Sequence, residues 1–180
     1  MWFYSLSIGF LRLAYRVAAW FHPKARLFVN GRSKIFNRLQ SDFAKNEQKV
    51  IWMHCASLGE FEQGRPVLER IRKDFPGYKI LLTFFSPSGY EIRKNYTGAD
   101  YIYYLPWDSR NHARRFIEIT KPVLAIFVKY EFWYHYTNTL SKKSIPLISI
   151  SSIFRNNQSF FQWYGVFFRK IKKKFNHFFV

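Results

Sequence analysis

The feature that most constrains the fold of this chain is a regular alternation, from residue 49 onward, between short apolar runs and longer amphipathic segments. The apolar runs are KVIWMHC (49–55), KILLTFF (79–85), YIYYLP (101–106), VLAIFVKY (123–130) and PLISISSI (146–153). The segments between them, 60–75, 90–96, 110–121 and 131–143, have the spacing of helices. Nearly continuous apolar runs are typical of parallel strands buried on both faces. We therefore predict an α/β fold, a Rossmann-like parallel sheet with helices on both faces.

The character of the sequence divides the chain into three parts. Residues 1–48 form a hydrophobic and basic segment, residues 49–156 form the predicted Rossmann-like domain, and residues 157–180 form a basic, aromatic tail. Most of the tail, SFFQWYGVFFRKIKKKFNHFF (159–179), is predicted to be helical. At 180 residues the chain is long enough for one domain with a proper hydrophobic core.

The N-terminal stretch WFYSLSIGFLRLAYRVAAWF (2–21) is nearly continuous apolar sequence, interrupted by Arg12 and Arg16. A signal peptide has its basic residues before the apolar core, whereas here they lie within it and beyond it. Because Arg12 and Arg16 are four residues apart, they share one face of a helix, which favours a helix that lies in the membrane interface. Two alternatives stay open: a single tilted span, and a helix packed on its own domain.

The charge of the chain restricts the partners that it can bind. It has 29 Lys and Arg residues against 11 Asp and Glu residues, a net charge of +18. Such a chain should bind nucleic acid, an anionic membrane face or a phosphorylated substrate. The five histidines lack metal-ligand spacing, and no glycine motif for nucleotide phosphates is present. No metal is therefore expected. His54 is interpreted as a hydrogen-bonded structural residue, and Cys55 as a small buried one.

Polar and small residues follow the predicted strands. Because the carboxyl ends of parallel strands meet at one edge of a sheet, ligands of such folds bind there. The candidate binding residues at this edge are Ser57, Gly59 and Glu60 after the first strand, Ser86, Ser88 and Gly89 after the second, Trp107 and Asp108 after the third, Lys129, Glu131 and Trp133 after the fourth, and Ser151, Ser152 and Arg155 after the fifth. Hydroxyl groups, glycines, carboxylates and cations in one place suit a polyhydroxylated, anionic ligand.

Glu60 has two interpretations. As an acid in the first turn of a helix it would complement the helix dipole, a contribution of about 0.3–1 kcal/mol. As a carboxylate in a crevice it could accept a proton from a substrate hydroxyl, which is the role of a general base. Glu131 is equally open, since it could serve the site, pair with Lys129 or cap the next helix.

Five motifs follow one another in the order and spacing of a known family. They are HCASLGE (54–60), LTFFSPSG (82–89), YLPWD (104–108), KYEFW (129–133) and SIPLISISSIFR (144–155). Together they resemble the N-terminal half of the Kdo transferases. These membrane-associated glycosyltransferases move 3-deoxy-D-manno-octulosonic acid (Kdo) from CMP-Kdo onto a lipid A precursor. The hydrophobic N-terminus followed by basic residues also fits this family.

The resemblance implies a GT-B architecture, in which two Rossmann-like domains face each other across a cleft. It implies that Glu60 is the catalytic base, which deprotonates an acceptor hydroxyl for one inverting displacement of CMP. Glu131 would be a second catalytic acid of the site. No cofactor is implied, since CMP-Kdo is the donor substrate. Substrate binding would involve Ser57, Gly59, Ser86, Ser88, Gly89, Lys129 and Arg155.

In this family the donor nucleotide is held mainly by a C-terminal domain, so we expect little transfer from this chain alone. The expected partners are a lipid A precursor, CMP-Kdo through that further domain, and an anionic membrane surface, on the cytoplasmic face of the cell inner membrane. No nucleic acid is expected. Two other classes stay open: a basic nucleic-acid-binding module, which the sequence FFRKIKKKF (167–175) favours, and a non-catalytic membrane adaptor.

Overall fold

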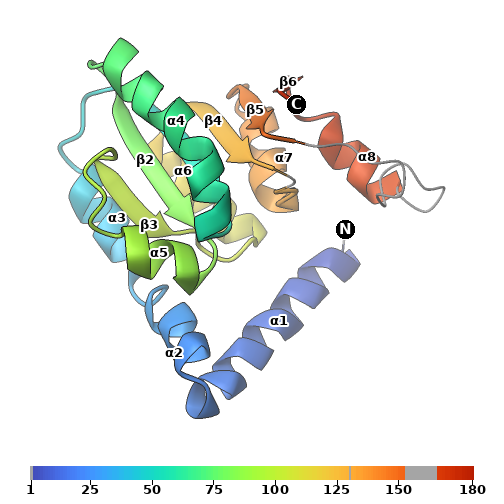
Figure 1. Cartoon of the computed structure of the whole chain (residues 1–180). Helices are drawn as coiled ribbons and strands as arrows, with labels where there is room; N and C mark the ends of the chain where they lie inside the picture. Colours follow the sequence, from blue (N-terminus) through green and yellow to red (C-terminus); the bar gives the residue numbers. More distant parts are fainter. Residues whose placement is uncertain (1, 130, 153–165) are drawn as a thin grey trace.

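The computed structural model describes residues 2–129, 131–152 and 166–180, and within them the chain forms a six-stranded parallel sheet (Figure 1). The strands are β1 (Val50–Cys55), β2 (Lys79–Phe84), β3 (Tyr101–Tyr104), β4 (Pro122–Val128), β5 (Leu147–Ile150) and β6 (His177–Phe178). Their order across the sheet is β3-β2-β1-β4-β5-β6, and every neighbouring pair is parallel. The predicted α/β, Rossmann-like fold is confirmed.

The helices fall into two main groups. Some connect consecutive strands, and others come before the first strand in the sequence. Four of them connect strands: α4 (Leu58–Asp74), α5 (Pro87–Arg93), α6 (Arg110–Thr120) and α7 (Tyr134–Lys142). Three lie N-terminal to the sheet, α1 (Trp2–Phe21), α2 (Pro23–Asn30) and α3 (Ile35–Phe43), and α8 (Val166–Lys172) precedes β6. Local sequence signals start α4 and α6, because the side chains of Ser57 and Ser109 accept hydrogen bonds from the backbone N–H groups of Glu60 and His112.

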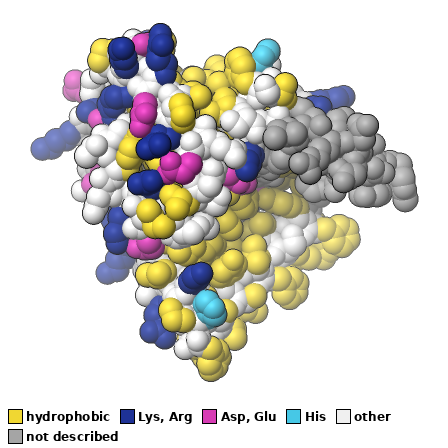
Figure 2. All heavy atoms as spheres, viewed as in Figure 1, with side chains coloured by type: hydrophobic (Ala, Val, Ile, Leu, Met, Phe, Trp, Pro, Cys, Tyr) yellow, Lys and Arg dark blue, Asp and Glu magenta, His cyan; other side chains and the backbone are white. Residues whose placement is uncertain are grey.

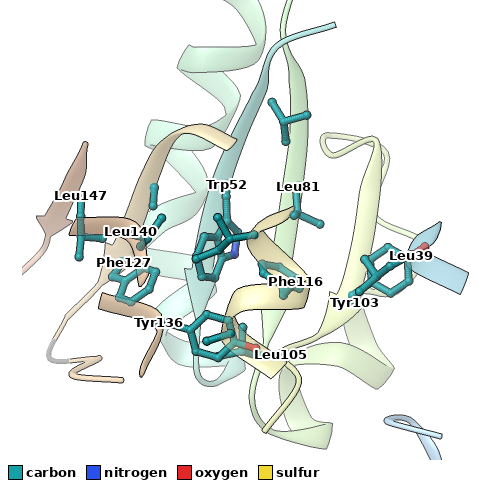
Figure 3. Packing of buried hydrophobic residues seen from close by; sticks show 14 of the residues in the cluster. Leu39, Trp52, Leu81, Tyr103, Leu105, Phe116, Phe127, Tyr136, Leu140 and Leu147 are labelled. Carbon is teal, nitrogen blue, oxygen red and sulfur yellow. The ribbon is translucent and has the colours of Figure 1, made fainter. Parts of the chain in front are cut away.

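Hydrophobic side chains cover both faces of the sheet. Trp52 and Met53 are neighbours in β1 and, as in any strand, they point to opposite faces. Trp52 lies in the larger cluster, together with Phe116, Phe127 and Tyr136 (Figure 3). Met53 lies in the second cluster, with residues of β2, β4 and α4. The apolar runs of the sequence are nearly continuous because the strands are buried on both sides.

The tail differs from the predicted helix over 159–179. In the part of the tail that the structure describes, the helix ends at Lys172, and the chain then adds β6 to the edge of the sheet. Asn176 connects this segment to β5 through two hydrogen bonds, from its N–H to Leu147 O (2.7 Å) and from Leu147 N–H to its Oδ1 (2.8 Å). The tail pairs here because the outer edge of β5 presents N–H and C=O groups that need partners.

The first 48 residues combine an outer helix with a part of the core. Helix α3 buries Ile35, Leu39 and Phe43 in the larger hydrophobic cluster, so the packed unit includes residues N-terminal to residue 49. Helix α1 has no buried residue. It forms one arm of a V with α2 (Figure 1), and the ring of Tyr15 stacks on Phe28 of α2 with 4.0 Å between the ring centroids. Within the residues described, no helix combines the length and the hydropathy that a membrane span requires.

Arg32, in the segment between α2 and α3, fixes this V to the sheet. Its side chain is buried, with 8% of the residue exposed, and it donates hydrogen bonds to Phe85 O after β2 (2.7 Å), Leu105 O after β3 (2.9 Å) and Phe28 O in α2 (3.0 Å). The guanidinium carbon also lies 3.8 Å from the centre of the Phe28 ring. Burial lowers the pKa of Arg32 to about 9. One side chain thus connects α2 with the carboxyl ends of two strands.

Asp108, the last residue of the motif YLPWD, connects two more helices to the sheet. Its buried carboxylate accepts hydrogen bonds from the N–H groups of His135 (3.2 Å) and Tyr136 (3.1 Å) at the start of α7. It also accepts a hydrogen bond from the Tyr4 hydroxyl group of α1 (2.5 Å). Burial raises the pKa of Asp108 to about 6. The carboxylate therefore stabilises the start of α7 and holds the first turns of α1 beside it.

We predict that Arg32→Lys lowers the free energy of unfolding by about 2–4 kcal/mol. A single ammonium group cannot reach all three carbonyl oxygens, and each buried acceptor left unpaired costs about 1–3 kcal/mol. Chemical denaturation measures this change. The control is Arg38→Lys, because Arg38 donates to Gly31 O at the surface (2.7 Å) and its replacement should change stability by less than about 0.5 kcal/mol. Equal losses in the two variants would contradict the structural role of Arg32.

Candidate active site

The candidate site lies at the carboxyl ends of β1 and β4, where the strand order reverses. The chain winds outward from β1 in one direction to β2 and β3, and in the other direction to β4 and β5, so the order reverses between β1 and β4. In open α/β sheets, ligands bind at the carboxyl ends of the strands at this reversal. Glu60, in the first turn of α4, follows β1, whereas Lys129 and Glu131 follow β4. The fold therefore brings these three predicted residues to the reversal.

Glu60 is half-buried and bends back over the start of its own helix. Its Oε2 atom accepts a hydrogen bond from Ala56 N–H (2.5 Å), while its own N–H donates to Ser57 Oγ (3.5 Å). This reciprocal arrangement is close to a capping box. Within the described residues Oε1 makes no hydrogen bond, so one oxygen of the carboxylate is left for a ligand. Helix capping and a role in the site are thus compatible.

The electrostatic surroundings of Glu60 raise its pKa. Burial is the largest cause, and the negative charge of Glu131 adds to it. The hydrogen bond from Ala56 N–H and the positive charge of Lys129 act in the opposite direction. A carboxylate with a raised pKa is a stronger base than an ordinary surface carboxylate. A raised pKa is compatible with the general-base interpretation of Glu60.

Glu131 lies beside a neutral histidine. Its Oε2 atom is 3.6 Å from Nε2 of the fully buried His54, and Trp133 Nε1–H donates a hydrogen bond to the same nitrogen (3.1 Å). An indole N–H only donates, so Nε2 must be the acceptor and Nδ1 must carry the proton. Nδ1 lies 2.9 Å from Thr83 Oγ1 and 3.1 Å from Thr83 O. His54 is thus the hydrogen-bonded structural residue that the sequence predicted.

Lys129 has a strained backbone at the end of β4. Its φ angle of 62° lies in the left-handed region, which is uncommon for residues other than glycine. Its N–H donates to Ile150 O (2.9 Å), and its carbonyl oxygen accepts from Ser149 Oγ (2.8 Å) and Ser152 Oγ (3.3 Å). Ser149 is not among the residues predicted from the sequence. The signal was present, since this serine interrupts an apolar run that is buried in the sheet.

The remaining predicted residues occupy different surroundings. Ser86 N–H donates to Ala56 O (2.8 Å), which joins the loops after β1 and β2, and Ser86 Oγ lies 2.7 Å from Ser88 Oγ. Gly59 is exposed, with open space where a Cβ atom would lie, whereas Gly89 is buried against the ring of Phe84. Arg155 lies outside the described residues. In the part of the chain that the structure covers, no cluster of three His, Cys, Asp or Glu residues could hold a metal ion.

An apolar pocket that the sequence analysis missed lies beside Ser86 and Ser88. It has a volume of about 760 Å³, is open on one side and is lined by residues of α1, α2 and the region of α5. Its apolar lining includes Tyr15, Ala18, Leu27, Phe28, Phe85 and Ile92. These residues come from three separate parts of the sequence, so no local pattern could reveal the pocket. It gives the strand-end site an apolar extension toward α1.

The parallel sheet, with polar residues at the strand ends on either side of its reversal, defines a Rossmann-like domain. A family model described as 3-deoxy-D-manno-octulosonic-acid transferase (kdotransferase) matches residues 31–180. The chain belongs to this family, as its five motifs predicted.

Curated relatives carry the same description. The 3-deoxy-D-manno-octulosonic acid transferase of Aquifex aeolicus is 38% identical over 90 residues, which cover 49% of this chain and 25% of that protein. The enzyme of Haemophilus influenzae is 31% identical over 54% of this chain and 23% of its own length, and that of Chlamydia trachomatis serovar D is 30% identical over 68% and 31%. This chain therefore spans between about a quarter and a third of the length of these relatives.

A solved structure has a similar fold. The putative UDP-N-acetylglucosamine 2-epimerase from Listeria monocytogenes superposes with a TM-score of 0.51 over 74% of this chain and 40% of that chain. The sequences are 10% identical, so this likeness shows the fold alone.

The two predicted binding glycines should respond differently to an added methyl group. In Gly89→Ala the Cβ atom would lie 2.3 Å from Phe84 Cδ1, and the overpacking should lower the free energy of unfolding by about 1–3 kcal/mol. Gly59→Ala meets nothing within 4 Å and should change stability by less than about 0.5 kcal/mol. Urea denaturation compares the two variants. If Gly89→Ala is as stable as Gly59→Ala, the Phe84 contact does not constrain position 89.

Proposed function

We propose that this chain is the acceptor-binding part of a Kdo transferase, which transfers Kdo from CMP-Kdo to a lipid A precursor in lipopolysaccharide biosynthesis. Membership of the family and the acidic, basic and hydroxyl groups at the strand ends support this function. The observation that carries it is Glu60. It lies at the sheet reversal with a raised pKa and one carboxylate oxygen that is not used in the helix cap. A further domain, as in the longer relatives, would hold the donor nucleotide.

In the proposed reaction Glu60 acts as general base. Its carboxylate takes the proton of an acceptor hydroxyl, the hydroxyl oxygen attacks the anomeric carbon of Kdo, and CMP leaves from the opposite side with inversion of configuration. Lys129 and Arg155 would attract the anionic groups of the substrates, and Ser57, Gly59, Ser86, Ser88 and Gly89 would line the acceptor side. Glu131 is proposed as a second acid that raises the pKa of Glu60 by its charge. The reaction needs no cofactor.

The apolar pocket beside Ser86 and Ser88 suits the acyl chains of a lipid acceptor. Its volume of about 760 Å³ and its apolar lining match a hydrocarbon ligand better than a sugar. The pocket is also continuous with the serines proposed to contact the acceptor sugar. The polar head of such a lipid would contact the polar strand ends. Its acyl chains would contact the apolar lining on α1 and α2.

The outer face of α1 suits a membrane surface. Phe3, Phe10, Leu13, Val17 and Trp20 recur at helical spacing and are exposed, Phe10 by 70% and Trp20 by 77%. We call these residues the α1 apolar stripe. Figure 2 shows hydrophobic side chains gathered over α1. With a net charge of +18, the chain would dock through this stripe on an anionic membrane, which we propose to be the cytoplasmic face of the inner membrane.

Glu60→Gln tests the catalytic proposal. In the presence of the C-terminal domain of a Kdo transferase, CMP-Kdo and a lipid A precursor, we expect the transfer rate to fall by about 10²–10⁴-fold, since an amide cannot accept the proton. Glutamine retains the side-chain oxygen of a capping box, so the variant should fold normally. The control Glu62→Gln, which removes the ion pair with Arg93 (2.6 Å), should keep the rate. Equal rates for Glu60→Gln and the unchanged chain would rule out Glu60 as the base.

The double variant Phe10→Glu, Val17→Glu tests membrane docking. Two charges in the α1 apolar stripe should weaken binding to phosphatidylglycerol vesicles by at least about tenfold, and salt should release the unchanged chain. Val67→Glu, at an exposed apolar position of α4, is the control and should bind nearly normally. If the double variant binds as tightly as the control, the stripe is not the docking face. If RNA displaces the unchanged chain from vesicles, the nucleic-acid-binding alternative gains support.

A further inference from the structure

A second pocket, with a volume of about 380 Å³, lies on another side of α1. It is formed where α1, the start of α3, the loop after β3 and helix α6 meet. Five cationic side chains line it, Arg12 and Arg16 from α1, Arg32 and Lys34 before α3, and Arg115 from α6, and no Asp or Glu is among the lining residues. We call it the basic pocket. Among the residues predicted for the strand-end site, Trp107 lines the basic pocket, whereas Glu60, Lys129 and Glu131 do not.

The cations of the basic pocket have no carboxylate partner in the described part of the chain. Elsewhere on the molecule, basic residues such as Arg70, Arg72 and Lys94 form ion pairs. None of the five lining cations forms such a pair with a described residue, although Arg32 donates to three carbonyl oxygens. Like charges held around one cavity repel each other, so an anion in the pocket would lower the electrostatic energy of the fold.

Besides Arg32, one of these cations is already held in place. Arg115 donates a hydrogen bond to Gln40 Oε1 (2.9 Å), and its guanidinium carbon lies 4.6 Å from the centre of the Phe36 ring. Both partners belong to α3, whose first residues line the same pocket. A guanidinium group that is oriented in advance loses less side-chain entropy when it binds a ligand.

Backbone and imidazole groups add to the polar character of the pocket. Helix α3 begins after Lys34, whose φ angle of 53° is left-handed, and no side chain caps its first turn. Its positive end is therefore directed at a pocket that Ile35 and Phe36 help to line. His112 also lines the pocket, and its Nδ1 atom, which is shielded from solvent, has no hydrogen-bond partner among the described residues.

We propose that the basic pocket binds a phosphomonoester group. A phosphomonoester carries a charge between −1.5 and −2 at neutral pH and three acceptor oxygens, which match the guanidinium groups of Arg12, Arg16 and Arg115. The pocket is larger than a single phosphate group, so part of the attached alcohol fits as well. This inference does not depend on glycosyl transfer, and its test uses no transfer assay.

The position of the pocket on α1 favours a membrane lipid as the carrier of the phosphate. Arg12 and Arg16 lie on the helix face next to the α1 apolar stripe, so a helix docked through that stripe would hold the pocket at headgroup level. A soluble sugar phosphate offers the same group without the lipid. The experiment therefore contains one arm for each source.

The test compares two double variants of the full chain that lower the net charge equally. Arg12→Gln, Arg115→Gln removes two cations of the basic pocket, whereas Arg110→Gln, Arg114→Gln removes two cations of α6 that do not line it. Isothermal titration with inorganic phosphate should show binding to the unchanged chain and to the α6 control. The affinity should fall by at least about tenfold in the pocket variant, since it loses two charge-assisted hydrogen bonds.

The His112 ring reports on the same site by NMR. Burial and the charges of Arg12 and Arg115 lower the pKa of His112, so a bound phosphate should raise that pKa in the unchanged chain and leave it unaltered in the pocket variant. The proposal would be overturned if the unchanged chain did not bind phosphate, or if both double variants lost phosphate affinity equally.

Vesicles identify the source of the phosphate. Two kinds of phosphatidylcholine vesicle are compared at matched surface charge, one containing phosphatidate and the other phosphatidylglycerol. If the carrier is a lipid, the unchanged chain should bind the phosphatidate vesicles more tightly. The pocket variant should lose this preference. If phosphate and glucose 1-phosphate bind but the vesicles are not distinguished, the pocket takes a soluble sugar phosphate and the lipid assignment is wrong.

Discussion

The rest of the structure depends on one buried cation, Arg32, which the fold surrounds with backbone carbonyl oxygens and aromatic rings. A buried guanidinium group is costly unless its donors are satisfied, so its three acceptors define where α2 lies against the ends of β2 and β3. Because α1 packs on α2, this contact also decides which faces of α1 meet the sheet. The positions of both pockets beside α1 therefore depend on the contacts that Arg32 makes.

Helix α1 presents three faces with different chemistry. One face holds Tyr4 against Asp108 and Tyr15 against Phe28, which joins the helix to its own domain. A second carries Arg12 and Arg16 into the basic pocket. The third exposes the α1 apolar stripe. An interfacial helix and a helix packed on its own domain were alternatives from the sequence, but a single helix can serve both purposes because packing uses only one of its sides.

At the strand ends, a structural role and the proposed catalytic role can share one residue. Glu60 caps α4 through one oxygen, and this contact orients the carboxylate at the sheet reversal. Asp108 is different, because its carboxylate is used by the start of α7 and by Tyr4. Both acids stand in family motifs, yet only the contacts made by each side chain separate an acid that is open to a ligand from one that holds helices together.

The sequence by itself determined the sheet, its helices and the residues at the strand ends, because buried parallel strands impose apolar runs and the chain direction places their ends at one edge. The short strand β6 and the long-range contacts were decided by the tertiary structure. The hydrogen bond of Ser149 to Lys129, the carbonyl contacts of Arg32 and the grouping of five cations in the basic pocket each join segments that lie apart in the chain. Local sequence patterns do not reveal such long-range contacts, because these contacts form only when separate elements pack together.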